Sequence, residues 1–232
     1  MKKSNDISSL LEVKNLSKSY PLPGRPHDFL QVFSDVSLIV EKGQSVAITG
    51  KSGTGKSTFL HVVAGLDRAD SGQVFYQGED IFTFSDKRIS AFRSRNIGFI
   101  FQANHLLSDF SARENLVLTA CIGGTPERQA IERASYLLEA VGLAERASHR
   151  PYEMSGGELQ RVAIARAVMN SPDIIFADEP TGSLDEENAQ MVEALLFSLV
   201  QAEQSTLFLV THNDTLAGRC DRHYVLKHKQ LE

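Results

Sequence analysis

The chain has 232 residues, of which 42% are hydrophobic, and its formal net charge at pH 7 is −5. These values predict one large α/β domain, or one domain with an inserted subdomain, around a sizeable core. The acidic balance gives no electrostatic footprint for nucleic acid or anionic lipid. The 2 cysteines lie far apart and lack metal-ligand spacing. No segment is long and apolar enough to span a bilayer, so work at a membrane would need another polypeptide to hold the chain there.

The N-terminal part of the chain predicts short β elements. Strands are expected over residues 10–20, 36–40 and 46–49, and a loosely alternating stretch over 72–82 indicates a short antiparallel element. The segment 21–28, between the first two strands, is rich in proline and predicts a loop.

A glycine-rich stretch separates the third of these strands from a helix-like run. Its residues are Gly50, Lys51, Ser52, Gly53, Thr54, Gly55, Lys56, Ser57 and Thr58. Glycines let the backbone fold tightly so that successive N–H groups point at a polyphosphate, and the following helix adds the positive end of its dipole. This order and spacing predict a phosphate-binding loop rather than a plain turn. Lys56 would reach the β- and γ-phosphates, and the hydroxyl of Ser57 would ligate Mg²⁺.

Four continuous apolar runs indicate parallel strands that are buried on both faces. The runs and the residues that end them are 46–49 with Gly50, 97–101 with Gln102, 174–177 with Asp178 and Glu179, and 207–211 with His212. Ligands of open α/β sheets bind outside the carboxyl ends of the strands. The sequence therefore predicts that these end groups converge on one edge of a sheet, beside the phosphate loop.

Asp178 and Glu179 are adjacent carboxylates at a strand end, so their side chains point different ways. Asp178 can hold Mg²⁺, through water, and Glu179 can orient or deprotonate an attacking water. The alternative is a pair of solvated loop acids, which the preceding apolar strand and the phosphate loop both disfavour.

The pattern becomes helical after Gln102. We interpret residues 103–155 as a helical subdomain inserted within a single domain that spans residues 1–232, because no strand pattern interrupts that stretch. The last predicted strand is followed only by a short tail. The helices expected in this half of the chain cover residues 112–121, 126–141, 159–170 and 186–201.

Ser155 and Glu158 have the spacing of a capping box at the start of a helix. A cap alone does not explain Gly156 and Gly157, because glycine in a first turn costs up to about 1 kcal/mol relative to alanine. Their use would be to let a phosphate approach bare backbone at the helix N-terminus. One chain would then own two phosphate-binding helix ends, and the economical arrangement is a head-to-tail pair of chains that share two sites.

Over nearly its whole length, the sequence resembles the ATP-binding subunits of ABC transporters. The resemblance implies an α/β P-loop core with a mostly parallel sheet and helices on both faces, a small antiparallel β-part and an inserted helical subdomain. It also implies Mg²⁺-dependent ATP hydrolysis in a nucleotide-sandwich homodimer. The matching motifs are the Walker A loop at 50–58, the Q-loop Gln102, the signature at 155–158, Walker B at 174–179, the D-loop at 183–185 and the switch His212.

Roles for individual residues follow from this resemblance. Tyr20 would stack on adenine, and His212 would contact the γ-phosphate. The other residues implied in nucleotide binding are those of the stretch 50–58 and Ser155, Gly156, Gly157, Glu158 and Asp185. The residues implied in catalysis are Lys56, Gln102, Glu179 and His212. Those implied in Mg²⁺ binding are Ser57, Gln102 and Asp178.

Finer features resemble the lipoprotein-releasing group of these ATPases, namely Gly65-Leu66-Asp67, the segment 179–185 and the Pro-rich loop after Tyr20. This resemblance implies release of lipoproteins from the inner membrane. The partners would be two integral-membrane permease subunits, which present the lipoprotein cargo, and the chain would lie peripherally on the cytoplasmic face.

Three alternatives stay open at this point. The same features resemble the ATPases of macrolide exporters and of the cell-division machinery, although the short chain without a fused membrane segment argues against the exporter type. A nucleic-acid ATPase is disfavoured, because the chain is acidic and has neither a long coiled-coil insertion nor a second ATPase domain. Met154, Leu159 and Asn213 depart from the family pattern, but none of these departures removes a phosphate or Mg²⁺ contact.

Overall fold

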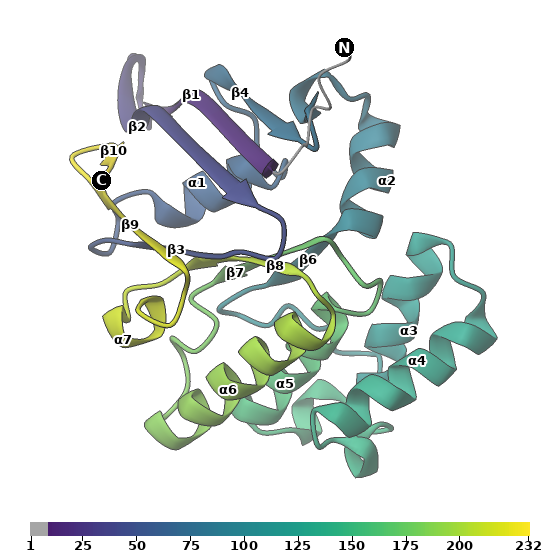
Figure 1. The fold of residues 1–232 in the computed structure, drawn as a ribbon. Helices are drawn as coiled ribbons and strands as arrows, with labels where there is room; N and C mark the ends of the chain where they lie inside the picture. Colours follow the sequence, from purple (N-terminus) through teal and green to yellow (C-terminus); the bar gives the residue numbers. More distant parts are fainter. Residues whose placement is uncertain (1–8) are drawn as a thin grey trace, which may run out of the picture. The chain divides into compact units, whose positions relative to one another are not determined.

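The computed structural model describes residues 9–232 (Figure 1). Within it the chain forms two compact units. The first unit combines the residues up to Ile89 with Val210–Glu232, and the second unit is Ser90–Leu209.

The first unit contains the predicted antiparallel β-part. Its sheet has the strand order β2-β1-β4-β5. Side chains of β1 alternate between buried and more exposed positions over much of the strand, as a sheet with one covered face requires. The strands are β1 (Ser9–Leu22), β2 (Arg25–Glu41), β4 (Ser71–Tyr76) and β5 (Glu79–Asp80).

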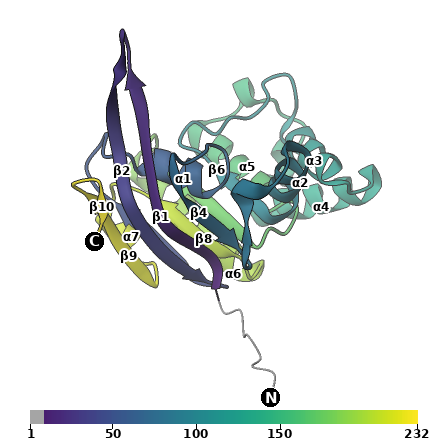
Figure 2. The same cartoon turned by 90° about the horizontal axis from the view of Figure 1, so that it is seen from above.

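The loop predicted over residues 21–28 is wrong, because β1 and β2 continue through it as a long hairpin (Figure 2). Only the Pro23–Gly24 turn separates the two strands, and Gly24 has the positive φ of 73° that such a turn demands. Pro21 is opposite Phe29 in the ladder with β2 and lies beyond the last pair of β1 with β4. A strand tolerates proline where it has a partner strand on one side but not on the other. The number of prolines in this segment therefore did not indicate a loop.

The phosphate-loop region of the first unit lies between β3 (Ser45–Thr49) and α1 (Lys56–Val63). Strand β3 pairs in parallel with β9, with Thr49 opposite Val225. The C-terminal segment that was predicted to be a short tail without regular structure instead forms the strands β9 and β10. Only Leu226 of β9 is buried, so this strand lacks the apolar run that revealed the others. The remaining elements of the first unit are η1 (Ile81–Thr83), α7 (Asp214–Ala217), β9 (Arg222–Lys227) and β10 (Gln230–Leu231). Helix α2 (Asp86–Asn96) begins in the first unit and continues into the second from Ser90.

The second unit holds three of the predicted buried strands in the order β8-β7-β6. Every residue of β7 and β8 is buried, which confirms the interpretation of their continuous apolar runs. For β6 the prediction of burial on both faces is wrong, because this strand ends the sheet order and its Ile97 and Phe99 are only half-buried. Phe176 lies between two neighbours in the core, with ring centroids 5.6 Å from Phe99 and 5.3 Å from Phe208. The strands are β6 (Ile97–Ile100), β7 (Ile174–Asp178) and β8 (Thr206–Val210).

Helices account for all regular structure between β6 and β7. This agrees with the helical character expected there, while the boundaries proposed for a subdomain at 103 and 155 stay a prediction. A capping box at Ser111 and Glu114 begins α3. The helical elements of the second unit are α3 (Ala112–Gly123), α4 (Glu127–Ala140), η2 (Ala144–Arg146), η3 (Pro151–Glu153), α5 (Gly156–Ala167) and α6 (Glu186–Ala202).

Across residues 9–232, no helix combines the length and the apolar character that crossing a membrane would require.

One carboxylate secures the start of β3. Asp221 Oδ2 accepts hydrogen bonds from the backbone N–H of Ser45 at 2.8 Å and from its hydroxyl at 2.7 Å. These two bonds, the backbone one foremost, hold the pKa of Asp221 below its usual value. Because the folded-state pKa is lowered, the stabilisation is present above the unfolded-state pKa of about 3.9 and is lost as pH falls through the folded-state pKa.

We expect Asp221→Ala to lower the free energy of unfolding by about 1 kcal/mol at pH 7, or about 2–4 °C in Tm. The difference from the wild type should begin to shrink as the pH falls below about 3.9 and should disappear once the pH lies below the lowered pKa of Asp221 in the folded chain. Thermal melts over this pH range test the prediction. Asp28→Ala, which removes an exposed ion pair with Arg25, is the control and should change little at any pH. An Asp221→Ala defect that persists undiminished in acid would contradict the expectation.

Candidate nucleotide-binding site

The predicted phosphate loop, residues 50–58, turns tightly between β3 and α1 in the first unit. Thr54 closes the turn, since its backbone N–H and its hydroxyl donate to the Lys51 carbonyl at 3.3 and 2.9 Å. Lys56 is buried, and its Nζ donates to the Gly50 carbonyl at 2.9 Å and to the Lys51 carbonyl at 3.3 Å. The ammonium group therefore lies against the loop, where a polyphosphate is predicted to bind.

Gly55 directly precedes the first residue of α1, and only glycine fits this position, for two reasons. Its φ is 98°, which strains any L side chain. A Cβ at this position would also lie 2.2 Å from Cγ1 of Val32 in β2. Strand β2 therefore packs against the phosphate loop. The contact between β2 and α1 extends along the helix, because the rings of Phe33 and Phe59 pack in a T-shaped arrangement with 5.3 Å between their centroids.

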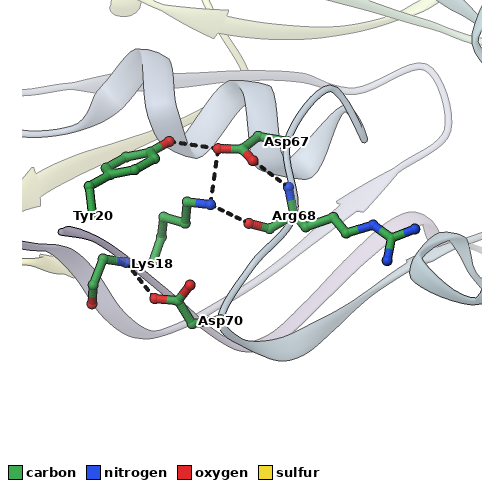
Figure 3. A network of polar contacts seen from close by, with 6 residues as sticks. Lys18, Tyr20, Asp67, Arg68 and Asp70 are labelled. Atoms are coloured by element: carbon green, nitrogen blue, oxygen red, sulfur yellow. Dashed lines mark hydrogen bonds and ion pairs between the residues drawn. The ribbon is translucent and has the colours of Figure 1, made fainter. Parts of the chain in front are cut away.

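Tyr20 belongs to the same unit and lies near the end of β1, with 39% of its surface exposed. Its hydroxyl donates a 2.6 Å hydrogen bond to Asp67 Oδ2, just beyond α1 (Figure 3). Burial first, and then Asp67, raise the pKa of Tyr20 to about 12, and an opposing hydrogen bond with the Thr58 side chain is outweighed. Tyr20 therefore stays a neutral donor with a partly open ring.

His212 is also part of the first unit and is exposed. The residue before it, Thr211, donates its backbone N–H to the carbonyl of Ile48 in β3 at 3.1 Å. His212 is consequently anchored beside the strand that leads into the phosphate loop. Asn213, which departs from the family pattern, caps the short α7 by accepting from the N–H groups of Thr215 and Leu216.

Gln102 and Asp178 lie at the same edge of the second unit's sheet. Strands β6 and β7 are parallel, with Ile100 opposite Ala177, so both residues follow the carboxyl ends of adjacent strands. The predicted convergence of strand ends is therefore confirmed within this unit. Asp178 is 9% exposed, whereas Gln102 is exposed. The buried Gln160 of α5 holds the preceding residue by donating to the Phe101 carbonyl at 3.2 Å.

Glu179 adopts a left-handed backbone conformation. Its φ is 46°, in the left-handed region that a non-glycine residue enters at a cost of about 1–3 kcal/mol. The Gly182 N–H donates to the Glu179 carbonyl at 3.0 Å and closes the turn that follows. Gln102 approaches this turn, because a Cβ at Gly182 would lie 3.3 Å from its Nε2. The second unit thus brings Gln102 and the residues after Glu179 together.

The capping box predicted for the signature segment is confirmed. The Glu158 carboxylate accepts from the Ser155 N–H at 2.8 Å, and Ser155 Oγ accepts from the Glu158 N–H at 3.3 Å. The first of these bonds is the main reason that the pKa of Glu158 lies below its usual value. Arg146 adds an ion pair to Glu158 at 3.3 Å, a partner that sequence reasoning missed.

Gly157 has a packing reason that the sequence did not reveal. A Cβ there would lie 2.5 Å from Asn188 Oδ1. Asn188 is held by Asp185, which caps α6 by accepting from the Asn188 N–H at 3.0 Å and from its amide at 2.7 Å. The glycine is therefore needed for the contact between α5 and α6, in addition to any role toward phosphate.

The donors proposed for Mg²⁺ fit a hard cation, since Ser57, Asp178 and Gln102 offer hydroxyl, carboxylate and amide oxygens. Over residues 9–232, no three His, Cys, Asp or Glu side chains gather as an all-protein metal cage. A set of few protein oxygens suits Mg²⁺, because this ion keeps water and substrate phosphates among its ligands.

Sequence comparisons identify relatives of the whole chain. A family model described as ABC transporter matches residues 33–182. The lipoprotein-releasing system ATP-binding protein LolD of Syntrophus aciditrophicus (strain SB) is 44% identical over 222 residues, which cover 96% of this chain and 98% of the relative. The protein of the same name from Shewanella sp. (strain MR-4) is 45% identical over 226 residues, or 96% and 95% of the two chains.

Among solved structures, the dimeric ATP-binding cassette MJ0796 in a post-hydrolysis state, bound to ADP and Pi, is similar with a TM-score of 0.87. It is 32% identical to this chain and covers 96% of both. The predicted fold class, an α/β P-loop core of the ABC type, is thereby confirmed. Because a family model covers more than half of the chain and relatives match nearly all of it, the chain belongs to the ABC transporter family, as an ATP-hydrolysing subunit.

Proposed function

We propose that this ATPase powers the release of lipoproteins from the inner membrane. The observation that carries the proposal is the likeness to proteins named LolD, at 44% and 45% identity over 96% of the chain. The partners are two integral-membrane permease subunits that present the lipoprotein cargo, and the chain lies peripherally on the cytoplasmic face of the membrane. Nucleic acid is not a partner in this proposal, in keeping with a net charge of −5.

The proposed chemistry assigns a separate role to each of the predicted site residues. Lys56 and the amides of the phosphate loop stabilise charge on the phosphates, and Tyr20 stacks on adenine. His212 contacts the γ-phosphate. Ser57, Asp178 and Gln102 would hold Mg²⁺, which would supply positive charge to the phosphates.

Glu179 acts on the attacking water as its orienting group or general base. The strained backbone of this residue supports the assignment, since such strain clusters at active sites. Ser155, Gly156, Gly157, Glu158 and Asp185 complete the nucleotide contacts, the signature residues coming from a second copy of the chain. The dimeric form of the MJ0796 cassette supports this arrangement.

The contact with the membrane subunits is proposed at an apolar segment of the second unit. Leu107 and Phe110 are 46% and 40% exposed. The buried Asn115 fixes the segment, because its Oδ1 accepts from the Leu107 N–H at 2.8 Å and its amide donates to the Leu107 and Phe110 carbonyls. A rigid loop that displays apolar side chains suits recognition of a partner protein.

We expect Glu179→Gln to lower the steady-state ATPase rate by about 10²–10⁴-fold while ATP affinity stays within about threefold of the wild type. Lys56→Ala should instead weaken ATP binding by about 10–100-fold, because a charged hydrogen-bond donor is lost. Calorimetric titration and turnover assays separate the two effects. Glu132→Gln, which breaks an exposed ion pair with Arg128, is the control and should match the wild type in both. Equal loss of binding in the two site variants would contradict the assigned roles.

Shared sites in a dimer can be tested by mixing inactive variants. If the loop of one chain works with the signature of the other, Lys56→Ala mixed with Ser155→Arg creates heterodimers with one intact site. Random mixing makes about half of the dimers heterodimers, and each heterodimer has one intact site out of two. About a quarter of the wild-type ATPase activity should therefore return. Lys56→Ala mixed with Glu179→Gln is the control, because both residues belong to the same half-site and no intact site forms. Recovery in both mixtures, or in neither, would argue against sites shared between chains.

We expect the Glu179→Gln chain, held in ATP, to co-purify from native membranes with paired integral-membrane subunits and lipoproteins. Leu107→Asp in the same background should reduce this recovery at least about tenfold, since it buries an unpaired charge at the contact. Ile39→Asp changes an equally exposed apolar residue on β2 and should leave recovery intact. A single membrane partner with regulators of cell-wall hydrolases would favour a cell-division role, and recovery of ribosomes or nucleic acid would refute the proposal.

A further inference from the structure

We propose that Asp67 and Lys18 are positioning residues that hold the Tyr20 ring in the orientation needed to stack on the base of a bound nucleoside triphosphate. The inference rests on the proposed function, because it assumes that Tyr20 contacts the base. It assigns a purpose to a buried lysine and a carboxylate that none of the six family motifs contains.

Asp67 is the centre of the network (Figure 3). Its Oδ2 accepts from the Tyr20 hydroxyl at 2.6 Å and pairs with Lys18 Nζ at 3.1 Å. Its Oδ1 accepts from the backbone N–H of Arg68 at 2.7 Å. Both carboxylate oxygens are therefore engaged, and the direction of the Tyr20 hydroxyl is fixed by a group that is itself fixed. The hydrogen bonds from Tyr20 and Lys18 keep the pKa of Asp67 low in spite of partial burial.

Lys18 is an unusual member of β1, because only 10% of its side chain is exposed. Its Nζ donates to the Arg68 carbonyl at 2.6 Å and lies 4.7 Å from the centroid of the Tyr20 ring. The ammonium thus restrains the ring and the carboxylate at the same time. The neighbouring Ser19 N–H donates to Asp70 at 2.6 Å, which ties the backbone of β1 to the same loop.

The network joins the ring to the helix of the phosphate loop. Asp67 follows α1, and that helix begins at Lys56. The distance from the ring to the phosphate-binding residues is thereby set by rigid elements rather than by a free tyrosine rotamer. Base–aromatic stacking contributes about 1–3 kcal/mol per base, and a ring that needs no ordering on binding retains more of that energy.

The test compares the binding of ATP with that of inorganic tripolyphosphate to the full chain by calorimetry. Tripolyphosphate reports on the phosphate loop alone, so the ratio of the two affinities isolates the base. Tyr20→Ala should lose about 10–100-fold in ATP affinity, the equivalent of the stacking energy. Asp67→Ala and Lys18→Met should each lose about three- to tenfold, with tripolyphosphate binding unchanged.

Two further variants separate positioning from general damage. Asp67→Asn keeps an acceptor for the Tyr20 hydroxyl and should retain more ATP affinity than Asp67→Ala. Tyr20→Phe removes the hydroxyl alone, and combining it with Asp67→Ala should cost no more than Asp67→Ala does, because both remove one interaction. Lys14→Met is the matched control, since Lys14 lies on the same strand, pairs with Glu12 and stands 4.8 Å over the Phe75 ring.

The outcomes are distinguishable. An Asp67→Ala chain that binds ATP as the wild type does, while Tyr20→Ala binds it weakly, overturns the positioning role and leaves the proposed function standing. Equal losses for ATP and tripolyphosphate in Asp67→Ala overturn it as well, because they reveal a damaged phosphate loop. A wild-type chain that binds ATP no more tightly than tripolyphosphate would remove the assumed base contact, and the positioning role with it. The proposed release of lipoproteins would still stand or fall on the co-purification from membranes.

Discussion

The close approach of β2 to the start of α1 is the contact on which the first unit depends. Val32 leaves no room for a Cβ at Gly55, and Phe33 packs on Phe59 one turn further along the helix. The backbone that turns at the phosphate loop is therefore shaped from outside as well as by its own glycines. Strand β1 pairs with β2 and carries Tyr20. The antiparallel sheet is in this way the support that places both an aromatic ring and a phosphate loop.

In the second unit, the packing of α5 on α6 similarly positions candidate site residues. Gly157 admits Asn188, and Asp185 holds Asn188 while it caps α6. Gln160, from the same helix as Gly157, restrains the residue before Gln102. The Q-loop, the signature helix and the D-loop are consequently linked by side chains within one compact body. Residues assigned to different motifs along the sequence are, inside this unit, parts of one hydrogen-bonded structure.

The elements that were predicted correctly from the sequence are those specified by local motifs and by continuous apolar runs. The turn between β3 and α1, the Ser155 cap and the strands β6, β7 and β8 follow from residue order alone, although β6 is only half-buried at Ile97 and Phe99. Prediction from the sequence failed where a partner decides the outcome, as in the hairpin through residues 21–28 and in β9, whose pairing with β3 overrides a polar sequence. The contacts of Asp67 with Tyr20 and of Asn188 with Gly157 were missed for the same reason, because each joins residues that lie far apart in sequence.

The charges of the Tyr20 network have a consequence for how nucleotide binding depends on pH. The pKa of Asp67 lies below its usual value and that of Tyr20 is about 12, so Asp67 stays ionised and Tyr20 stays neutral across the neutral range. The hydrogen bond that holds the ring therefore keeps the same protonation state over this range. Any change of affinity near neutral pH must then originate outside this hydrogen bond, for example in the phosphates of the nucleotide.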